Sequence, residues 1–208
     1  MRFEAVLDRL RAGLAAELPG ARAHAMLAPQ PRRDWPAGFD PAGIRHAAGL
    51  LLVFPVGDDA HVVLTVRADT LGRHSGQVSL PGGVAEPGES YPEAALREAH
   101  EEIALATTGV CVLGPLTPVD IPVSGFRLHP ILAAATARPS FAPADCEVAR
   151  ILEVGVADLR DPARLTSMSF SRDGHEIVAP SFHLEGVHIW GATAMILAEF
   201  LVLLGWAP

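Results

Sequence analysis

The chain has 208 residues, half of them hydrophobic, and a formal net charge of −8 from 16 basic and 24 acidic residues. This length and apolar content predict a single domain with a sizeable core, and the negative charge argues against a nucleic-acid binder held by bulk positive charge. Every basic residue is an arginine, which excludes a lysine nucleophile or a lysine Schiff base.

The first predicted element is an amphipathic helix within residues 1–18. Its apolar residues share one helical face, namely Phe3, Val6, Leu7, Leu10, Leu14 and Leu18. Acidic and basic residues interrupt them, which argues against a signal peptide. Residues 27–43 are Pro-rich and irregular. We therefore expect residues 1–44 to form a helical arm that packs on a domain made of residues 45–208.

The rest of the chain alternates predicted strands and helices. Two strands, residues 46–56 and 60–68, form a hairpin, and their continuous apolar runs indicate that both faces are covered. A Gly/Pro-rich loop over residues 71–89 leads to a helix over residues 91–103. Mostly strands follow, within residues 109–121, 128–137, 143–165 (with a small helix) and 170–191 (a hairpin). This order indicates one α/β domain.

The C-terminal run, residues 189–208, is strongly apolar and carries one charge, Glu199. A membrane helix needs about 20 consecutive apolar residues and basic flanks, whereas Gly191, Thr193 and Glu199 interrupt this run. We therefore expect a buried terminal helix, or a helix at the interface of a homo-oligomer such as a homodimer, and no membrane partner.

The two cysteines, Cys111 and Cys146, show no CxxC spacing. This argues against a disulfide framework and against a cysteine zinc site. We expect two buried, reduced thiols in a cytoplasmic protein.

An acidic cluster stands on the helix predicted over residues 91–103. Ser90 is a suitable N-cap, with Glu93 three residues later as a capping box requires. Glu98, Glu101 and Glu102 then share one helical face, where like charges destabilise an isolated helix by a few tenths of a kcal/mol per pair, about 0.2–0.5. A solvated acidic face is one interpretation. The other is a site for a hard divalent cation, which prefers carboxylate ligands.

The spacing around this cluster resembles the Nudix box of the Nudix hydrolases. The matching residues are Gly83, Glu89, Arg97, Glu98, Glu101, Glu102 and Leu105, with Ala99 in the aliphatic position. The resemblance implies an α/β/α sandwich with a mixed β-sheet. It also implies an enzyme that hydrolyses a nucleoside diphosphate linked to another moiety.

The resemblance further implies a metal site. Mg²⁺ or Mn²⁺ would be bound by Glu98, Glu101 and Glu102, with the carbonyl group of Gly82 as an additional ligand, while Arg97 and Glu89 orient the carboxylates. For the general base, Glu147 is a candidate outside the box, and Glu89 and Glu102 are candidates inside it. Glu147 is equally well interpreted as a surface acid.

One position departs from the Nudix box, because Ala104 stands where the family has glycine. That glycine is expected to end the helix at positive φ, where alanine costs about 1 kcal/mol. Either Ala104 adopts this strained conformation, or the helix continues toward Gly109. In both cases the three glutamates keep their positions relative to one another.

Residues 63–83 resemble a second signature, found in the coenzyme A diphosphatase branch of this family. The matching residues are Leu64, Thr65, Arg67, Ala68, Gly76, Pro81, Gly82 and Gly83. Gly72 replaces the second arginine of the branch, although Arg73 is adjacent. The resemblance implies that Arg67 and Arg73 bind an anionic substrate and that the backbone at Gly83 approaches its phosphates.

The expected substrate is therefore a small nucleotide of the coenzyme A type, cleaved to 3′,5′-ADP and 4′-phosphopantetheine or its acylated form. ADP-ribose, NADH or another nucleoside diphosphate derivative is the alternative substrate, and a non-catalytic nucleotide-binding module is the alternative function. Arg67 has a second interpretation as a brace for its loop. Trp190 is expected in the core rather than as a platform for a base.

Overall fold

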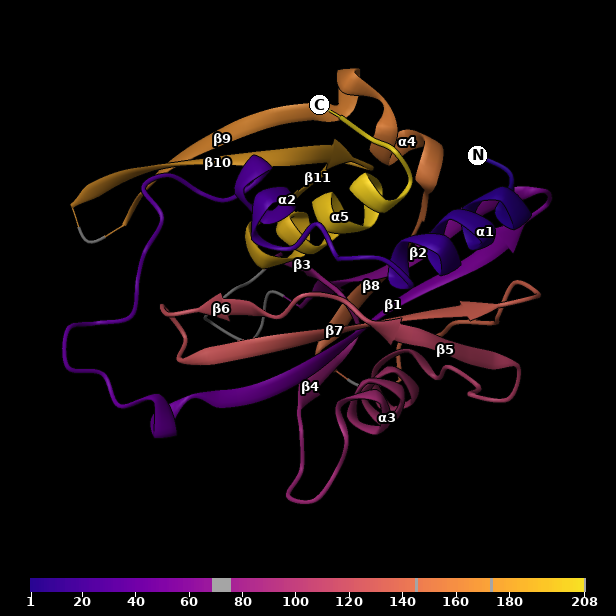
Figure 1. Ribbon diagram of the computed structural model, residues 1–208, viewed down its shortest axis with the longest axis horizontal. Helices are drawn as coiled ribbons and strands as arrows, with labels where there is room; N and C mark the ends of the chain where they lie inside the picture. Colours follow the sequence, from indigo (N-terminus) through magenta and orange to yellow (C-terminus); the bar gives the residue numbers. More distant parts are fainter. Residues whose placement is uncertain (69–75, 145, 173, 208) are drawn as a thin grey trace.

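The predicted helices and strands occur in the expected order along the chain, together with elements that the sequence did not predict (Figure 1). The computed structural model describes residues 1–68, 76–144, 146–172 and 174–207. The α-helices are α1 (Phe3–Leu14), α2 (Ala21–Met26), α3 (Tyr91–Ile103), α4 (Val156–Arg160) and α5 (Gly191–Leu203). The strands are β1 (Arg45–Val56), β2 (Asp59–Arg67), β3 (Val78–Ser79), β4 (Gly82–Val84), β5 (Val110–Pro115), β6 (Val119–Ile121), β7 (Phe126–Ala135), β8 (Val148–Gly155), β9 (Leu165–Arg172), β10 (His175–Leu184) and β11 (Val187–Trp190).

The larger sheet has eight strands and is mixed. Its main path runs β3-β2-β1-β7-β5, while β4 pairs with β1, β6 with β7 and β8 with β2. Strands β1 and β7 are parallel, and β1 and β2 form the predicted antiparallel hairpin. The middle of β1 is buried continuously, which confirms that both faces of this strand are covered.

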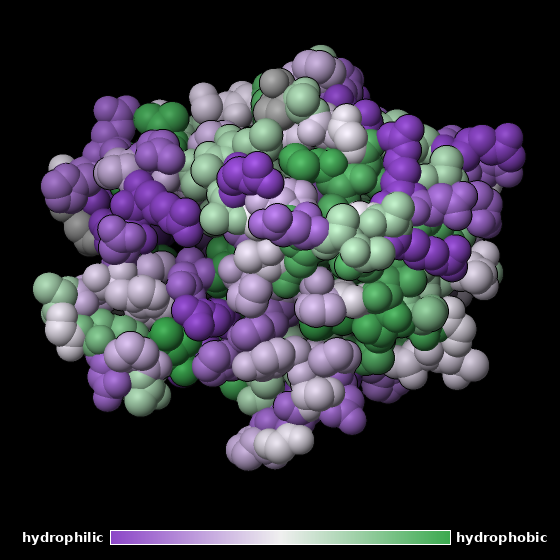
Figure 2. All heavy atoms as spheres, in the orientation of Figure 1, coloured by the Kyte–Doolittle hydropathy of each residue, from purple (hydrophilic) through white to green (hydrophobic). Residues whose placement is uncertain are grey.

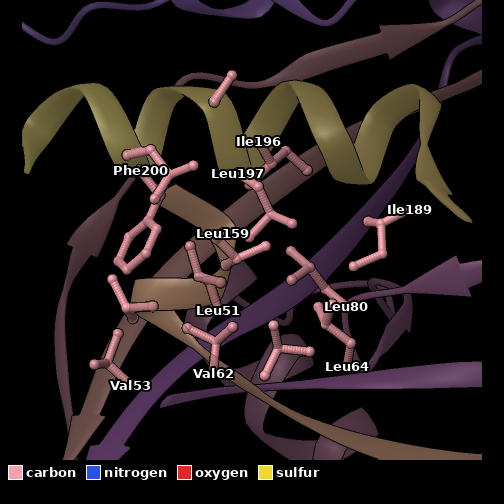
Figure 3. Close-up of a cluster of buried hydrophobic side chains, with 14 of the residues drawn as sticks. Leu51, Val53, Val62, Leu64, Leu80, Leu159, Ile189, Ile196, Leu197 and Phe200 are labelled. Carbon is pink, nitrogen blue, oxygen red and sulfur yellow. The ribbon is translucent and has the colours of Figure 1, made fainter. Parts of the chain in front are cut away.

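Helices cover the two faces of this sheet. In Figure 1, α3 lies on one side and α1, α2 and α5 lie on the other. Alternate residues of β1 serve the two cores: Leu50 and Leu52 belong to the cluster with α3, and Leu51 and Val53 belong to the cluster with α5. Figure 3 shows the second cluster, where Leu51 and its neighbours lie beneath α5. The predicted α/β/α sandwich with a mixed sheet is therefore confirmed.

Strands β9, β10 and β11 form a second, antiparallel sheet. The sequence predicted only a hairpin within residues 170–191, so the first strand, β9, was missed. Its burial alternates weakly along the strand, because only one face is partly covered. A strand with so little apolar alternation carries a weak signal for sequence-based prediction.

The terminal helix α5 is buried along its whole middle, from Thr193 to Leu201. This confirms the predicted buried helix, since a helix that is apolar all round must be covered on every side. The single charge, Glu199, is fully buried and accepts hydrogen bonds from the backbone N–H groups of Gly20 (3.0 Å) and Thr117 (3.1 Å). Within the part of the chain described above, no helix is both long and apolar enough to cross a membrane.

The N-terminal segment packs on the same core. The buried face of α1 consists of Phe3, Val6, Leu7 and Leu10, as predicted, although the helix ends at Leu14 and not at residue 18. Helix α2 was not predicted, because its six residues are too few to show a helical period. The irregular stretch after it contains a short 3₁₀ turn, Pro41–Gly43, and an isolated bridge from Gln30 to Val178 of β10.

Two local predictions were wrong. Cys111 and Cys146 are free but exposed, not buried. Cys111 lies on β5, which is the end strand of the sheet path and is largely exposed, and Cys146 lies in the loop before β8. In addition, the described part of the predicted loop 71–89 contains the short strands β3 and β4.

Candidate active site

The glutamate helix α3 begins and ends as its local sequence dictates. The Ser90 hydroxyl accepts a hydrogen bond from the Glu93 backbone N–H, and the Glu93 carboxylate accepts one from the Ser90 backbone N–H at 2.9 Å. This is the predicted capping box. Three small buried residues, Ala94, Ala95 and Ala99, let the helix lie close to β1. The acidic residues are thereby fixed at the edge of this contact.

Helix α3 ends at Ile103, and Ala104 takes the left-handed conformation with φ 53° and ψ 31°. Of the two expected outcomes, the structure therefore selects the strained alanine over the longer helix. The chain turn is closed by a hydrogen bond from the Leu105 backbone N–H to the Ala99 carbonyl, 3.4 Å long. Leu105 itself is buried, which anchors the turn in the core.

Arg97 is the centre of the acidic cluster. Its guanidinium donates to both carboxylate oxygens of Glu89, at 2.9 and 3.0 Å, to Glu98 at 3.0 Å and to Glu101 at 3.1 Å. A further bond reaches the Val84 carbonyl at 3.1 Å. Residues Arg97, Glu89, Glu98 and Glu101 are thus brought together, and one cation offsets part of the repulsion among the acids.

These bonds also change proton affinities. The hydrogen bond from Arg97, with help from the Glu86 backbone N–H, lowers the pKa of Glu89. The hydrogen bond to Glu89 and the bond and charge of Glu98 raise the pKa of Arg97 above its usual range. The guanidinium therefore stays charged, and Glu89 stays ionised at neutral pH.

The glycines before the helix form a backbone cradle for the glutamates. Strand β4 pairs with β1, with Gly82 opposite Gly49 and Gly83 opposite Ala48. The Gly82 backbone N–H donates to the Glu102 carboxylate at 3.1 Å. A Cβ atom at Gly83 would lie 2.5 Å from the Glu98 carboxylate. Both glutamates therefore converge on this backbone, which only glycine leaves open enough.

The donor set fits a hard divalent cation. In the described ranges, no three His, Cys, Asp or Glu side chains are already arranged as the ligands of one ion, since Arg97 and the Gly82 N–H engage the carboxylates. Glu98 and Glu102 nevertheless face the same glycine backbone, and Glu101 has a side chain that is 54% exposed and can rotate. Carboxylate and carbonyl oxygens at one helix face are the ligands that Mg²⁺ and Mn²⁺ accept.

Arg67 and Glu147, predicted for different roles, form an ion pair with an N–O distance of 3.0 Å. The Ala68 backbone N–H also donates to the Glu147 carbonyl at 2.8 Å. This contact is the brace that was the second interpretation of Arg67. The chain just before Glu147 is held at the end of α3, because the Ala144 backbone N–H donates to the Glu102 carbonyl at 3.0 Å. Arg73, like Gly72, lies outside the described residues.

A cavity of about 600 Å³ opens beside the glycine cradle. Gly82 and Gly83 form part of its wall, together with Arg67 and residues of β6, β9 and the start of α5. In Figure 2 the surface is hollowed on the left, between the part that carries β9 and β10 and the part that carries β6, and hydrophilic side chains stand at the rim. This volume is in the range of small-molecule sites, about 300–1,000 Å³.

Several residues that line this cavity were missed or misplaced by sequence reasoning. Arg32 and Arg33 come from the N-terminal segment, and Phe170 and Arg172 come from β9. Trp190 also lines the cavity and contacts Phe170 edge-on, with 5.0 Å between ring centroids, so it is not a purely core residue. The paired arginines in a Pro-rich segment were the only signal available in the sequence.

Comparison with known proteins shows which family this chain resembles. The model of the NUDIX domain matches residues 45–171. A relative from Enterobacter sp. (strain 638), named Uncharacterized Nudix hydrolase NudL, is 31% identical over 165 residues, which cover 79% of this chain and 85% of the relative. A protein of the same name from Yersinia enterocolitica is 36% identical over 155 residues, covering 73% and 78%. A MutT/nudix family protein from Enterococcus faecalis shares the fold, with a TM-score of 0.51, 16% identity and coverage of 82% and 64%.

Proposed function

The chain belongs to the Nudix hydrolase family, and we propose that it hydrolyses the diphosphate linkage of coenzyme A or one of its derivatives. The products are 3′,5′-ADP and 4′-phosphopantetheine or its acylated form. The observation that carries this proposal is the cavity that starts at Gly82 and Gly83, directly beside the glutamate helix. A substrate whose diphosphate lies at these glycines extends into that cavity.

The lining of the cavity suits a long substrate that is anionic at some points and apolar at others. Four arginines of the described ranges line it, in a chain whose formal net charge is −8. Phe126, Phe170 and Trp190 add aromatic surface. Coenzyme A combines a diphosphate, a nucleotide base and a pantetheine chain, and each of these needs one of the two kinds of surface.

The proposed cofactor is Mg²⁺ or Mn²⁺, held by Glu98, Glu101 and Glu102 with the Gly82 carbonyl as a further ligand. When bound, such an ion polarises a phosphoryl oxygen and lowers the pKa of a coordinated water. Arg97 keeps the carboxylates in place, since it donates to Glu98 and Glu101. The orientation of the Arg97 guanidinium is in turn fixed by its hydrogen bond to Glu89. Substrate binding would bring a further anion to Arg67, a residue that lines the cavity.

The general base is proposed among the remaining carboxylates. Glu89 gives both of its oxygens to Arg97, and its pKa is lowered by that bond. A carboxylate with lowered pKa accepts a proton less readily, which disfavours Glu89 in this role. Glu102 and Glu147 stay as candidates, and Glu147 would first have to leave its ion pair with Arg67.

A substrate panel tests the proposal. Coenzyme A, acetyl-coenzyme A, ADP-ribose, NADH and a nucleoside triphosphate are incubated with the protein in Mg²⁺ and in Mn²⁺, and the products are separated by chromatography. We expect the highest kcat/KM for a coenzyme A compound, with 3′,5′-ADP as product. Higher kcat/KM for ADP-ribose or NADH would overturn the substrate assignment. Binding without turnover of any compound would favour a non-catalytic nucleotide-binding module.

A further inference from the structure

The segment between α2 and β1 is tied down at two points on either side of the cavity. At Gln30 it forms a two-residue bridge to β10: the Gln30 backbone N–H donates to the Val178 carbonyl at 2.8 Å, and the Val178 N–H donates back at 2.9 Å. At Trp35 it reaches the other sheet, where the Trp35 side chain hydrogen-bonds Asp120 of β6. We call residues 30–35 the arginine strap.

The arginine strap carries Arg32 and Arg33 between its two anchor points, and both residues line the cavity. They are therefore held at the cavity wall by backbone and side-chain contacts on both sides. In Figure 1 this segment runs along the edge of the molecule, from the side of β9 and β10 to the side of β6. Its position is thus set by the same two parts that form the walls of the cavity.

Among the residues that the structure describes, basic side chains dominate the cavity wall. The charged ones are Arg32, Arg33, Arg67 and Arg172 against one acid, Asp120. Asp120 is already engaged by both ends of the Arg127 guanidinium, at 2.6 and 3.0 Å, which is the main cause of its lowered pKa. Arg127 thus engages this acid from both ends, and Glu147 pairs with Arg67. The arginine strap and Arg172 bring three further guanidinium groups to the described part of the wall, which favours an anionic ligand.

Aromatic surface lies beside these arginines. Phe170 and Trp190 pack edge-on, and the Arg172 guanidinium lies over the Phe170 ring, 5.5 Å from its centroid. An aromatic surface next to a cationic one suits a nucleobase whose sugar carries a phosphate, since the base can stack and the phosphate can pair. A pantetheine chain is neutral and would form no ion pair with these three arginines.

We propose that Arg32 and Arg33, together with Arg172, form a subsite for the 3′-phosphate of the adenosine end of coenzyme A. This inference rests on the proposed function. The subsite is built from residues outside the range 45–171 that the family model matches. The arginine strap therefore selects a substrate that carries a second anionic group, while the glycine cradle and the glutamate helix act on the diphosphate.

The test compares two substrates that differ only in this group, coenzyme A and 3′-dephospho-coenzyme A. We expect R32Q and R33Q each to lower kcat/KM for coenzyme A about tenfold or more, chiefly through KM, as loss of a charge-assisted bond to phosphate does. For the dephospho compound kcat/KM should not change. R22Q is the matched control, because Arg22 is an exposed arginine of α2 that does not line the cavity. Equal losses on both substrates, or no loss on either, would overturn the subsite.

A binding measurement separates this inference from the proposed function. Isothermal titration calorimetry with 3′,5′-ADP and with 5′-AMP needs no turnover. We expect tighter binding of 3′,5′-ADP to the wild type and equal binding of the two nucleotides to the R32Q/R33Q double variant. If the wild type hydrolyses no coenzyme A compound, the proposed function fails. The preference for 3′,5′-ADP over 5′-AMP in this binding measurement still tests whether the subsite binds the 3′-phosphate. Equal binding of the two nucleotides by the wild type would refute it.

Discussion

Replacing Ala104 by glycine should stabilise the protein, although the change removes a methyl group and adds freedom to the chain. Ala104 follows α3 with φ 53° and ψ 31°. An L-residue with a side chain pays about 1–2 kcal/mol in this left-handed conformation, and glycine does not. Glycine also adds conformational entropy to the unfolded chain, which costs about 0.4–1 kcal/mol. The expected gain in the free energy of unfolding is the difference, about 0.5–1 kcal/mol.

In a protein of this size, 1 kcal/mol shifts Tm by about 2–4 °C, so A104G should raise Tm by about 1–4 °C. Thermal unfolding followed by circular dichroism, with urea unfolding as a second measure, checks this value. The matched control is A106G, because Ala106 is equally exposed, lies two residues away and is not in the left-handed region. The control should lose about 0.4–1 kcal/mol. If A104G lost as much as A106G, the strain assigned to Ala104 would be wrong.

Four further predictions concern the acids and the glycine cradle. Gly83→Ala should leave Tm nearly unchanged, because the Glu98 carboxylate that the new Cβ would meet at 2.5 Å can rotate away. Turnover should nevertheless fall about 100-fold. Unchanged turnover in a kinetic assay would contradict the role of the glycine cradle in placing Glu98. Glu101→Gln should cut turnover far more than stability, which should stay within about 0.5 kcal/mol because the side chain is 54% exposed, and equal losses would make the acid structural. Glu199→Leu should cost about 3 kcal/mol in urea unfolding, since it leaves buried donors unpaired. Burial acts to raise the pKa of Glu199, but the hydrogen bonds from His24 and Thr117 outweigh burial, so the pKa is lowered. The stability that this carboxylate contributes is therefore present above pH 4.5 and is lost as the pH falls through the lowered pKa. Glu199→Gln should lack this loss of stability on the acid side of its stability profile.

The glutamate helix could be predicted almost completely from the sequence. Its bounds, residues 91–103, are those found in the structure, as is the capping box at Ser90. These features depend on residues three or four positions apart, so the local sequence contains all the information that they need. For Ala104 the sequence left two outcomes open, because a helix end also depends on whether the next residue, here Leu105, can be buried.

The surroundings of the helix could not be predicted in the same way. The pairing of Arg67 with Glu147 joins residues that are far apart in the chain, and each was predicted for a separate role. The exposure of Cys111 follows from the place of β5 at the end of the sheet path, not from the residues next to it. Such features are set by which strands become neighbours, and a short apolar run does not specify its neighbours.

The amino-acid sequence by itself determined the elements that follow a local period: the central strands with their continuous apolar runs, the buried terminal helix, and the face that unites Glu98, Glu101 and Glu102. Only the tertiary structure decided that Arg97 would link those acids to Glu89, and that an irregular segment near the N-terminus would close one wall of the cavity. The physical reason is that periodicity records which face of an element is buried, whereas the charge and shape of a cavity arise from side chains that meet only when separate elements pack together.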